Sequence, residues 1–317
     1  MKQLSIIIIH YKTIEETFNC ITSIFRETKT IDFEIIVVDN NSNDTSKARI
    51  LNAFPTINWI ENELNEGFAR ANLKGVNHAS GEYILLLNSD TIIIENAIEK
   101  SLIKLQQLNA EIGMLGCKLI NEDGTNQQSV YYNTSGFKNQ IENNLLYSTV
   151  IKWCKLKQHQ PTEIKALMGA FLLFNKSLVE QCGFMDSDFF LYAEEFEWMD
   201  RIRSKGYKLY YYTETKIIHL GEKSSSKLLN VKQRTLSAGL LFLKTHGRIG
   251  FLWFLIIDLI NQVIAILYGL LNRVKLSDQL KHARIFISLL PYFLKLFLKF
   301  NSKTKKVNFL VKLNDFK

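Results

Sequence analysis

The sequence is poor in proline and cysteine and lacks the best-known nucleotide-binding motifs. With only three prolines in 317 residues and 47% hydrophobic residues, a disordered chain is excluded and a folded protein is predicted. The four cysteines are widely separated and form no CxxC pair, which excludes a zinc ribbon or a disulfide scaffold and favours a reducing compartment. Neither GxGxxG nor GxxxxGK[ST] occurs, so a dinucleotide dehydrogenase or a P-loop enzyme would lack its key element.

The first apolar stretch is short. Residues 6–9 are four isoleucines typical of a strand, and no small-residue cleavage site follows them. We therefore expect no signal peptide, and we expect the catalytic part of the protein to lie in the cytoplasm.

Charge is divided unevenly along the chain. Of 39 Lys and Arg residues, 17 lie after residue 222 beside only three acidic residues, which leaves 22 basic and 28 acidic side chains before it. A basic tail attracts polyanions, either nucleic acid or anionic lipid. Because long apolar runs interrupt the basic residues, we favour a membrane surface over nucleic acid. We predict a catalytic domain at residues 1–222 and a basic, amphipathic, helical tail at residues 223–317.

The tail has apolar stretches at residues 249–271 and 285–300. Asp258, Asn261 and Gln262 interrupt the first, and Pro291 breaks the second. A bilayer span needs about 20 mostly apolar residues, and a central Asp costs roughly 2.5–3.5 kcal/mol. We therefore favour helices lying in the membrane interface over a true span. A helical domain that packs on the body, or in a dimer, is the alternative.

Three early apolar runs each end in polar side chains. Continuous Ile, Val and Leu runs are typical of strands covered on both faces, and helical patterns separate these runs. This alternation predicts an α/β fold whose ligands gather at the carboxyl ends of the strands. The polar ends are His10-Tyr11, Asp39-Asn40-Asn41-Ser42 and Asn88-Ser89-Asp90. Helices are expected at residues 14–25, 69–79, 96–112 and late in 188–205, and strands at 166–174, 208–212 and 216–219.

The strand ends offer nucleotide-binding and metal-binding chemistry. Asp39 can accept from a base N–H or a ribose hydroxyl. Gly67 allows close backbone approach at a helix start that suits an anion, and Arg70 could pair with a phosphate. Asp90 can hold a divalent cation against phosphates, with His219 as a further ligand. A plain Asx turn at Asn88-Ser89-Asp90 is the alternative that the companion motifs argue against.

Three carboxylates, those of Glu194, Glu195 and Glu197, follow an aromatic run. They could be a solvated first helical turn. The aromatic side chains argue against full solvation, and an apolar wall raises a carboxylate's pKa toward the range of a general base.

These motifs, in this order, resemble the family 2 inverting glycosyltransferases of GT-A fold, and within them the rhamnosyltransferase-like branch. The resemblance implies a mostly parallel central sheet with flanking helices, the nucleotide-diphospho-sugar transferase type, over about residues 4–245. The matching residues are 5–11, 36–42, 65–72, 81–90, 168–173, 183–186, 189–195, 201–207 and 218–219.

The resemblance also implies roles for individual residues. Asp90 and His219 would hold Mg²⁺ or Mn²⁺, and Glu195 would be the catalytic base. Donor-binding residues would be His10, Tyr11, Asp39, Ser42, Asn65, Gly67, Arg70, Asn88 and Ser89. Two positions depart from the usual pattern: Asn88 replaces the first Asp of a DxD-type motif, and Glu195 stands where Asp is usual. The second departure leaves the base between Glu195, Glu194 and, less favoured, Glu197.

The predicted activity is inverting sugar transfer from a nucleotide-sugar donor, of the dTDP-rhamnose or UDP-hexose type. The acceptor would be a glycan, lipid-linked at the inner face of the membrane, in synthesis of a cell-surface polysaccharide such as O-antigen or capsule. The enzyme would be peripheral, held on anionic lipid by its tail, with no nucleic-acid partner. A catalytically impaired sugar-nucleotide-binding protein of the same fold is the rival prediction, because of Glu at the base position.

Overall fold

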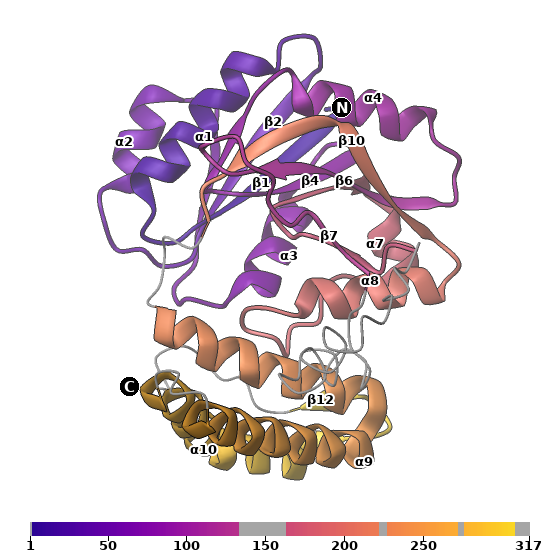
Figure 1. Cartoon of the computed structure of the whole chain (residues 1–317). Helices are drawn as coiled ribbons and strands as arrows, with labels where there is room; N and C mark the ends of the chain where they lie inside the picture. The colour runs from indigo at the N-terminus through magenta and orange to yellow at the C-terminus, as the bar shows by residue number, and fades with distance from the viewer. Residues whose placement is uncertain (1, 133–162, 222–226, 272–275, 308–317) are drawn as a thin grey trace. The chain divides into compact units, whose positions relative to one another are not determined.

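The computed structural model describes residues 2–132, 163–221, 227–271 and 276–307 (Figure 1). The described residues form two compact units. Unit 1 contains residues 2–132, 163–187 and 194–221, and unit 2 contains residues 188–193, 227–271 and 276–307.

Unit 1 is built on one large sheet. Its strands are β1 Leu4–His10, β2 Phe33–Asp39, β3 Asn58–Glu61, β4 Tyr83–Asn88, β5 Thr91–Ile93, β6 Ile112–Ile120, β9 Phe171–Asn175 and β10 Lys208–His219. They lie in the order β3-β2-β1-β4-β9-β6-β10-β5. The β3-β2-β1-β4 pairs and the β6-β10 pair are parallel, whereas β9 and β5 run antiparallel to their neighbours. The sheet is therefore mixed and mostly parallel, as the sequence predicts.

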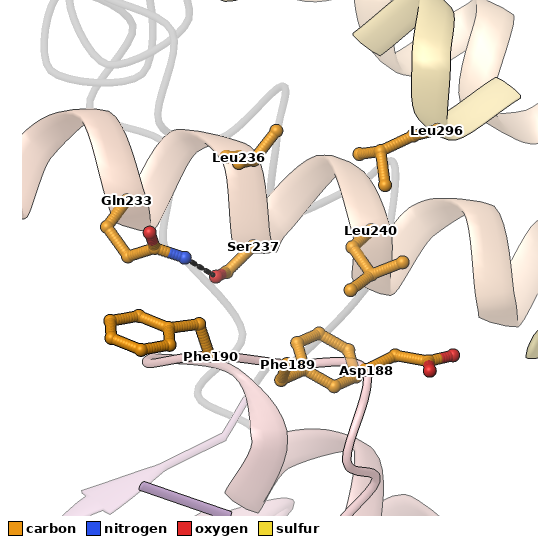
Figure 2. A pocket seen from close by; sticks show the side chains of 8 residues that line it. All are labelled: Asp188, Phe189, Phe190, Gln233, Leu236, Ser237, Leu240 and Leu296. Atoms are coloured by element: carbon orange, nitrogen blue, oxygen red, sulfur yellow. Dashed lines mark hydrogen bonds between the residues drawn. The ribbon is translucent and has the colours of Figure 1, made fainter. Parts of the chain in front are cut away.

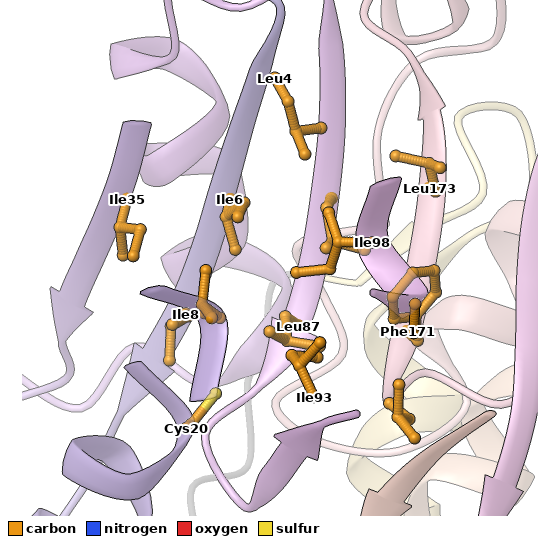
Figure 3. Close-up of a cluster of buried hydrophobic side chains, with 14 of the residues drawn as sticks. Leu4, Ile6, Ile8, Cys20, Ile35, Leu87, Ile93, Ile98, Phe171 and Leu173 are labelled. Atoms are coloured by element: carbon orange, nitrogen blue, oxygen red, sulfur yellow. The ribbon is translucent and has the colours of Figure 1, made fainter. Parts of the chain in front are cut away.

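Both faces of the sheet are buried, which explains the unbroken isoleucine run of β1. Successive strand side chains point to opposite faces. Ile6 and Ile8 accordingly belong to one buried cluster, shown in Figure 3, and Ile7 to another. A strand in which every second side chain is polar would contribute apolar side chains to only one of these clusters.

Helices cover the two faces with different side chains. Helices α1 (Ile14–Glu27) and α4 (Ala97–Gln107) contribute residues such as Ile21 and Leu102 to the Ile6 cluster. Helices α3 (Phe68–His78), α7 (Ser177–Cys182) and α8 (Glu194–Ser204) contribute to the Ile7 cluster, where Trp198 is completely buried. A short helix, α2 (Ser46–Ala53), and a small β7–β8 ladder (Val130–Tyr131 with Ala166–Leu167) complete the described part of unit 1.

Unit 2 is a pair of long helices with a small hairpin. Helix α9 (Lys227–Leu271) is interrupted at Gly247, whose φ of 67° and ψ of −169° are not helical. Helix α10 (Leu276–Lys299) packs on α9 through phenylalanine rings. The ring centre of Phe293 lies 5.8 Å from that of Phe251 and 6.1 Å from that of Phe254. Strands β11 (Phe300–Asn301) and β12 (Lys306–Val307) form the hairpin. Among the described residues, one helical stretch, Leu229–Leu267, is long and apolar enough to cross a bilayer.

Several predicted elements need correction. The helix expected at 96–112 ends at Gln107, because Ile112, which fits the helical spacing, instead starts the buried strand β6. The strand expected at 166–174 is two strands, β8 and β9, separated by a turn at Gly169-Ala170. The strands expected at 208–212 and 216–219 are one strand, β10, with an irregularity between Tyr212 and Lys216. The sequence reading missed β3, β5 and β6.

Candidate active site

The fold brings the predicted strand ends to one edge of the sheet. His10 and Asp39 are register partners at the ends of β1 and β2, and Asn88 is the partner of Ile9 at the end of β4. His219 ends β10, where it is the partner of Thr91, the residue after Asp90. Four polar clusters that are far apart in sequence therefore meet at one edge.

The end of β2 is tied to the end of β1. The Asp39 carboxylate accepts a hydrogen bond from the Ser42 amide at 2.9 Å, and the Ser42 hydroxyl accepts one from the Lys12 amide at 2.9 Å. The backbone of Asn41 between them is left-handed, with φ of 68°. Asp39 retains 8% exposure. Ser42 therefore shapes the loops at this edge, and its role as a donor ligand stays a prediction.

Asn40 holds the next loop and was not among the predicted site residues. Its side-chain oxygen accepts from Asn62 Nδ2 and from the Glu66 amide, both at 3.0 Å. Its amide nitrogen donates to Asn65 Oδ1 at 2.9 Å and to the Gly67 carbonyl at 3.1 Å. A buried amide with all these partners fixes the loop that leads into α3. The repeated Asn residues at 40, 62 and 65 were the only sequence signal.

The loop ends at Gly67, just before α3. Gly67 has φ of 82° and ψ of −176°, a backbone conformation that favours glycine. Asn65 Oδ1 accepts from the Gly67 amide at 3.0 Å. One turn into α3, Arg70 donates from Nε to the Ser187 carbonyl at 3.1 Å. Asn65 and Arg70 thus have structural bonds in addition to any contact with a donor.

His10 lies deeper than a pocket-lining residue is expected to lie. Its side chain is fully buried, its Nδ1 is 2.8 Å from Thr17 Oγ1, and its ring is 5.5 Å from that of Trp59. Burial lowers the pKa of His10, against the opposing effect of the Asp39 carboxylate. Nε2 has no hydrogen-bond partner among the described residues. Neighbouring Tyr11 is half-buried, with the Lys12 ammonium 5.4 Å from its ring centre.

Asp90 and His219 form the other end of the site. His219 Nε2 lies 3.4 Å from Asp90 Oδ1, and both side chains are mostly buried. The Leu220 amide donates to the Asp90 carbonyl at 2.8 Å, which joins β10 to the end of β4. The adjacent Ser89 hydroxyl is 3.3 Å from Thr13 Oγ1, and the Asn88 amide donates to the Ala170 carbonyl at 3.1 Å.

Gln127 sets the orientation of the His219 ring, and the sequence reading missed it. Its Nε2 donates to the His219 carbonyl at 3.3 Å and to Asn121 Oδ1 at 3.1 Å. Its Oε1 consequently faces His219 Nδ1 at 2.6 Å. Because an amide oxygen only accepts, Nδ1 carries a proton, and Nε2 is the ring nitrogen that faces Asp90.

This arrangement fits a divalent cation. Imidazole nitrogen and carboxylate oxygen are both common ligands of divalent cations, and a cation between Nε2 of His219 and Oδ1 of Asp90 would be bound by both. The chain offers two ligands here, since no group of three or more His, Cys, Asp or Glu side chains suited to a metal occurs among the described residues. Phosphate oxygens of a bound nucleotide could supply the others.

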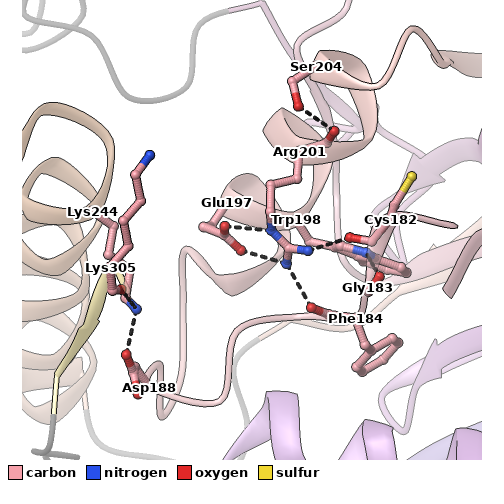
Figure 4. Close-up of polar contacts among 10 residues, drawn as sticks. All are labelled: Cys182, Gly183, Phe184, Asp188, Glu197, Trp198, Arg201, Ser204, Lys244 and Lys305. Carbon is pink, nitrogen blue, oxygen red and sulfur yellow. Dashed lines mark hydrogen bonds and ion pairs between the residues drawn. The ribbon is translucent and has the colours of Figure 1, made fainter. Parts of the chain in front are cut away.

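The acidic cluster at the start of α8 separates into three environments. Glu194 is buried, and burial, followed by the charge of Glu195, raises the pKa of Glu194 well above its usual value. Glu195 is half-buried, with its carboxylate close to Gly169: a Cβ there would be 3.7 Å from Oε1. Glu197 forms a bidentate ion pair with Arg201 at 2.6 and 2.8 Å (Figure 4).

Arg201 also donates to the carbonyls of Cys182 at 2.6 Å and Phe184 at 2.7 Å. Through this arginine, Glu197 is tied to the turn before α8, so its carboxylate serves the packing of the helix. Glu197 is therefore a poor candidate for a base. Glu195 is half-buried, with its Oε2 inside the protein, and Glu194 is buried as a whole.

The sequence is similar to those of known glycosyltransferases. The model of the family described as Glycosyl transferase family 2 matches residues 5–183, more than half of the chain. A hexosyltransferase of low-salt glycan biosynthesis, Agl10 from Haloferax volcanii, is 26% identical over 261 residues, covering 78% of this chain and 80% of Agl10. The poly-beta-1,6-N-acetyl-D-glucosamine synthase of Staphylococcus epidermidis is 27% identical over 180 residues, which cover 56% of this chain but only 40% of that protein.

A solved structure shares the fold. The mannosyltransferase PcManGT from Pyrobaculum calidifontis, in complex with GDP-Man and Mn²⁺, superposes with a TM-score of 0.54 at 14% identity, covering 96% of this chain and 84% of that one. Unit 1 therefore has the GT-A architecture that the sequence predicts. The comparison concerns the fold alone, so the roles of individual residues stay predictions.

Proposed function

The chain belongs to the Glycosyl transferase family 2, and on this premise we propose that it is an inverting enzyme that transfers a hexose from a nucleoside-diphosphate donor to a glycan hydroxyl. The observation that carries the proposal is the Asp90–His219 pair, 3.4 Å apart at the edge of the sheet where the nucleotide-side loops also end. A plain turn at Asn88-Ser89-Asp90 would need no histidine oriented by a glutamine.

The nucleotide would lie along the loops that follow β1, β2 and the strand before α3. Asp39, with some exposure remaining, would accept from the base or the ribose. The amides at the start of α3, next to Gly67, suit an anion such as the diphosphate. Arg70, one turn further, adds positive charge there.

Asp90 and His219 would hold Mg²⁺ or Mn²⁺ beside that diphosphate. The cation would neutralise charge on the diphosphate as it leaves. Gln127 would keep Nε2 of His219 available by accepting from Nδ1–H. Asn88 and Ser89 would support this strand end, Asn88 through its backbone amide and Ser89 through its hydroxyl near Thr13.

Glu195 would take the proton from the acceptor hydroxyl while the anomeric carbon is attacked from the opposite side to the leaving group. Two observations favour Glu195 over its neighbours. Glu197 is paired with Arg201, and Glu194 is buried as a whole, so its carboxylate is less able to reach an acceptor hydroxyl than that of half-buried Glu195. The neighbouring charge of Glu195 adds to the effect of burial in raising the pKa of Glu194.

We further propose that unit 2 lies on a membrane of anionic lipid, where the acceptor would be a lipid-linked glycan. The second half of α9 exposes one apolar face, spaced by three or four residues: Ile249, Leu252, Trp253, Ile256, Leu259, Ile260, Val263, Leu267 and Leu270. Helix α10 adds Ile287, Leu290, Leu294 and Leu298. Lysines at 295, 299, 303, 305 and 306 supply charge that attracts anionic headgroups.

The exposed side chains of these helices fit a location on the membrane surface better than a helix that crosses the bilayer. At the start of this α9 segment the opposite side is covered by α10, because Phe251 and Phe254 are buried against Phe293. A one-sided apolar face is typical of a helix that lies in the interface. Asp258 within the stretch adds to the cost of full insertion.

The donor can be identified by binding. The protein would be titrated by calorimetry with dTDP-rhamnose and a panel of UDP- and GDP-hexoses, each with and without Mn²⁺. We expect one donor to bind preferentially, and its affinity to fall when Asp90 is replaced by Ala. Unchanged affinity in Asp90→Ala would contradict the metal assignment. Binding of a donor with neither transfer nor hydrolysis would favour the rival function, a sugar-nucleotide-binding protein.

A further inference from the structure

The six residues before the acidic cluster belong to the helical unit, although the residues on either side of them belong to unit 1. Residues 188–193 are part of unit 2, whereas Ser187 and Glu194 are in unit 1. The Ser187 carbonyl accepts a hydrogen bond from Arg70, and Glu194 is the first residue of α8. The last residue of the segment, Ala193, is joined covalently to Glu194.

Helix α9 holds both ends of this segment with polar contacts. Lys244, only 5% exposed, donates to the Asp188 carboxylate at 2.5 Å and to the Lys305 carbonyl at 2.8 Å (Figure 4). The Val307 amide of the hairpin donates to the same carboxylate at 3.0 Å. Near the other end, the Ser237 hydroxyl donates to the Leu191 carbonyl at 2.7 Å.

Apolar and aromatic contacts fix the middle of the segment. Phe189 and Phe190 are buried, and they line a small hollow with Leu236, Leu240 and Leu296 from the helices (Figure 2). The guanidinium of Arg234 lies 4.8 Å from the ring centre of Tyr192. A polar contact near each end and buried rings between them leave the segment little freedom.

The segment ends in a conformation that the chain would not adopt unaided. Tyr192 and Ala193 both have left-handed backbones, with φ of 69° and 71°, and neither is glycine. Such residues persist only where the surroundings determine them. The contacts from α9 are the surroundings available within unit 2.

We propose that the helical unit is a positioning element for the catalytic base as well as a membrane-binding part. Lys244 and Ser237 of α9 hold residues 188–193, and these residues set where Glu194 and Glu195 begin α8. Lys244 and Ser237 are positioning residues, because they act through the segment. This inference rests on the proposed function in one respect, the assignment of Glu195 as the base.

The test compares two kinds of variant. In the first, α9 loses a contact with residues 188–193. In the second, α9 loses its contacts with the carbonyls at the end of α10 and the start of β11. Lys244→Met removes the ion pair with Asp188 and the hydrogen bond to the Lys305 carbonyl. Ser237→Ala removes the hydrogen bond to the Leu191 carbonyl and the one accepted from Gln233, with little effect on packing. Arg248→Met is the matched control, because Arg248 donates to the carbonyls of Phe297 and Phe300. Donor Kd, kcat with a detergent-soluble acceptor, and thermal unfolding are measured for each.

We expect kcat to fall about tenfold in Lys244→Met and about threefold in Ser237→Ala, since small displacements of a reacting group are costly. Donor Kd should be unchanged in both, and Arg248→Met should keep kcat. Normal kcat in folded Lys244→Met and Ser237→Ala would overturn the inference. An equal loss of kcat in Arg248→Met would do the same.

A second measurement does not depend on activity. Hydrogen–deuterium exchange of peptides covering residues 188–198 should speed up in Ser237→Ala and Lys244→Met and stay unchanged in Arg248→Met. Unchanged exchange in both α9 variants would overturn the inference. Glu195→Gln separates the two proposals: if it keeps transfer, the base assignment fails; if it is inactive while Lys244→Met is fully active, only the positioning role fails.

Discussion

Replacing Gln127 tests whether the geometry around His219 serves metal binding. Gln127→Leu keeps the size of the side chain but removes the oxygen that accepts from Nδ1–H at 2.6 Å. The imidazole would then lose its defined tautomer and orientation, and Nε2 would face Asp90 for only part of the time. Loss of such an outer partner typically weakens metal affinity 10- to 100-fold, about 1.4–2.7 kcal/mol. We expect an effect in this range.

The measurement is Mn²⁺ binding, followed by electron paramagnetic resonance of free Mn²⁺ in the presence of a saturating nucleoside diphosphate. Gln128→Leu is the matched control, because Gln128 is the exposed neighbour in the same loop. Gln127→Glu keeps an acceptor for Nδ1–H but loses the two hydrogen bonds that Nε2 donates, so its Mn²⁺ affinity should lie between those of the native protein and Gln127→Leu. If Gln127→Leu kept native affinity while Asp90→Ala lost it, the role of Gln127 would be refuted.

Three further predictions concern stability and membrane binding. Glu194→Gln should raise the unfolding temperature increasingly from pH 4.5 to pH 8. The pKa of Glu194 is raised in the folded state, so the native protein loses stability as pH rises and this side chain ionises. A glutamine does not ionise, so the variant does not lose that stability. A difference in unfolding temperature that stays the same at every pH would contradict this. Gly81→Ala should lower the free energy of unfolding by about 1–3 kcal/mol in denaturant unfolding, because its Cβ would lie 2.6 Å from the Ser5 amide nitrogen. A variant as stable as the native protein would show that the backbone shifts here without cost. Trp253→Glu should abolish flotation with phosphatidylglycerol vesicles, whereas Ile103→Glu, at a similarly exposed apolar site in unit 1, should not; equal flotation of both variants would count against the proposed membrane face.

Much of the fold could be predicted because its signals are local. The isoleucine run of β1 is buried on both faces, and that requirement is visible in four consecutive residues. The position of Asp90 after a buried strand is equally visible. The strands that were missed are either short, like β5, or start within a helical pattern, like β6 at Ile112. There, tertiary pairing overrides the local preference.

The remaining part of the site depends on contacts between distant residues. Gln127 meets His219 across 92 positions, and no spacing rule links a glutamine in a polar loop to a strand end. The partnership of Lys244 with Asp188 spans 56 positions and joins a helix of unit 2 to the segment before the acidic cluster. Asn40 was visible in its motif, but its four hydrogen bonds follow from how the loop folds back on it.

The most direct test of the central claim is transfer by the native protein and by Glu195→Gln. Each would be incubated with Mn²⁺, the donor selected by calorimetry and a lipid-linked glycan acceptor, and the released nucleoside diphosphate and the glycosylated product would be quantified. The account predicts metal-dependent transfer with inverted anomeric configuration by the native protein, and loss of transfer with donor binding retained in Glu195→Gln. Near-native transfer by Glu195→Gln, or a product of retained configuration, would contradict it.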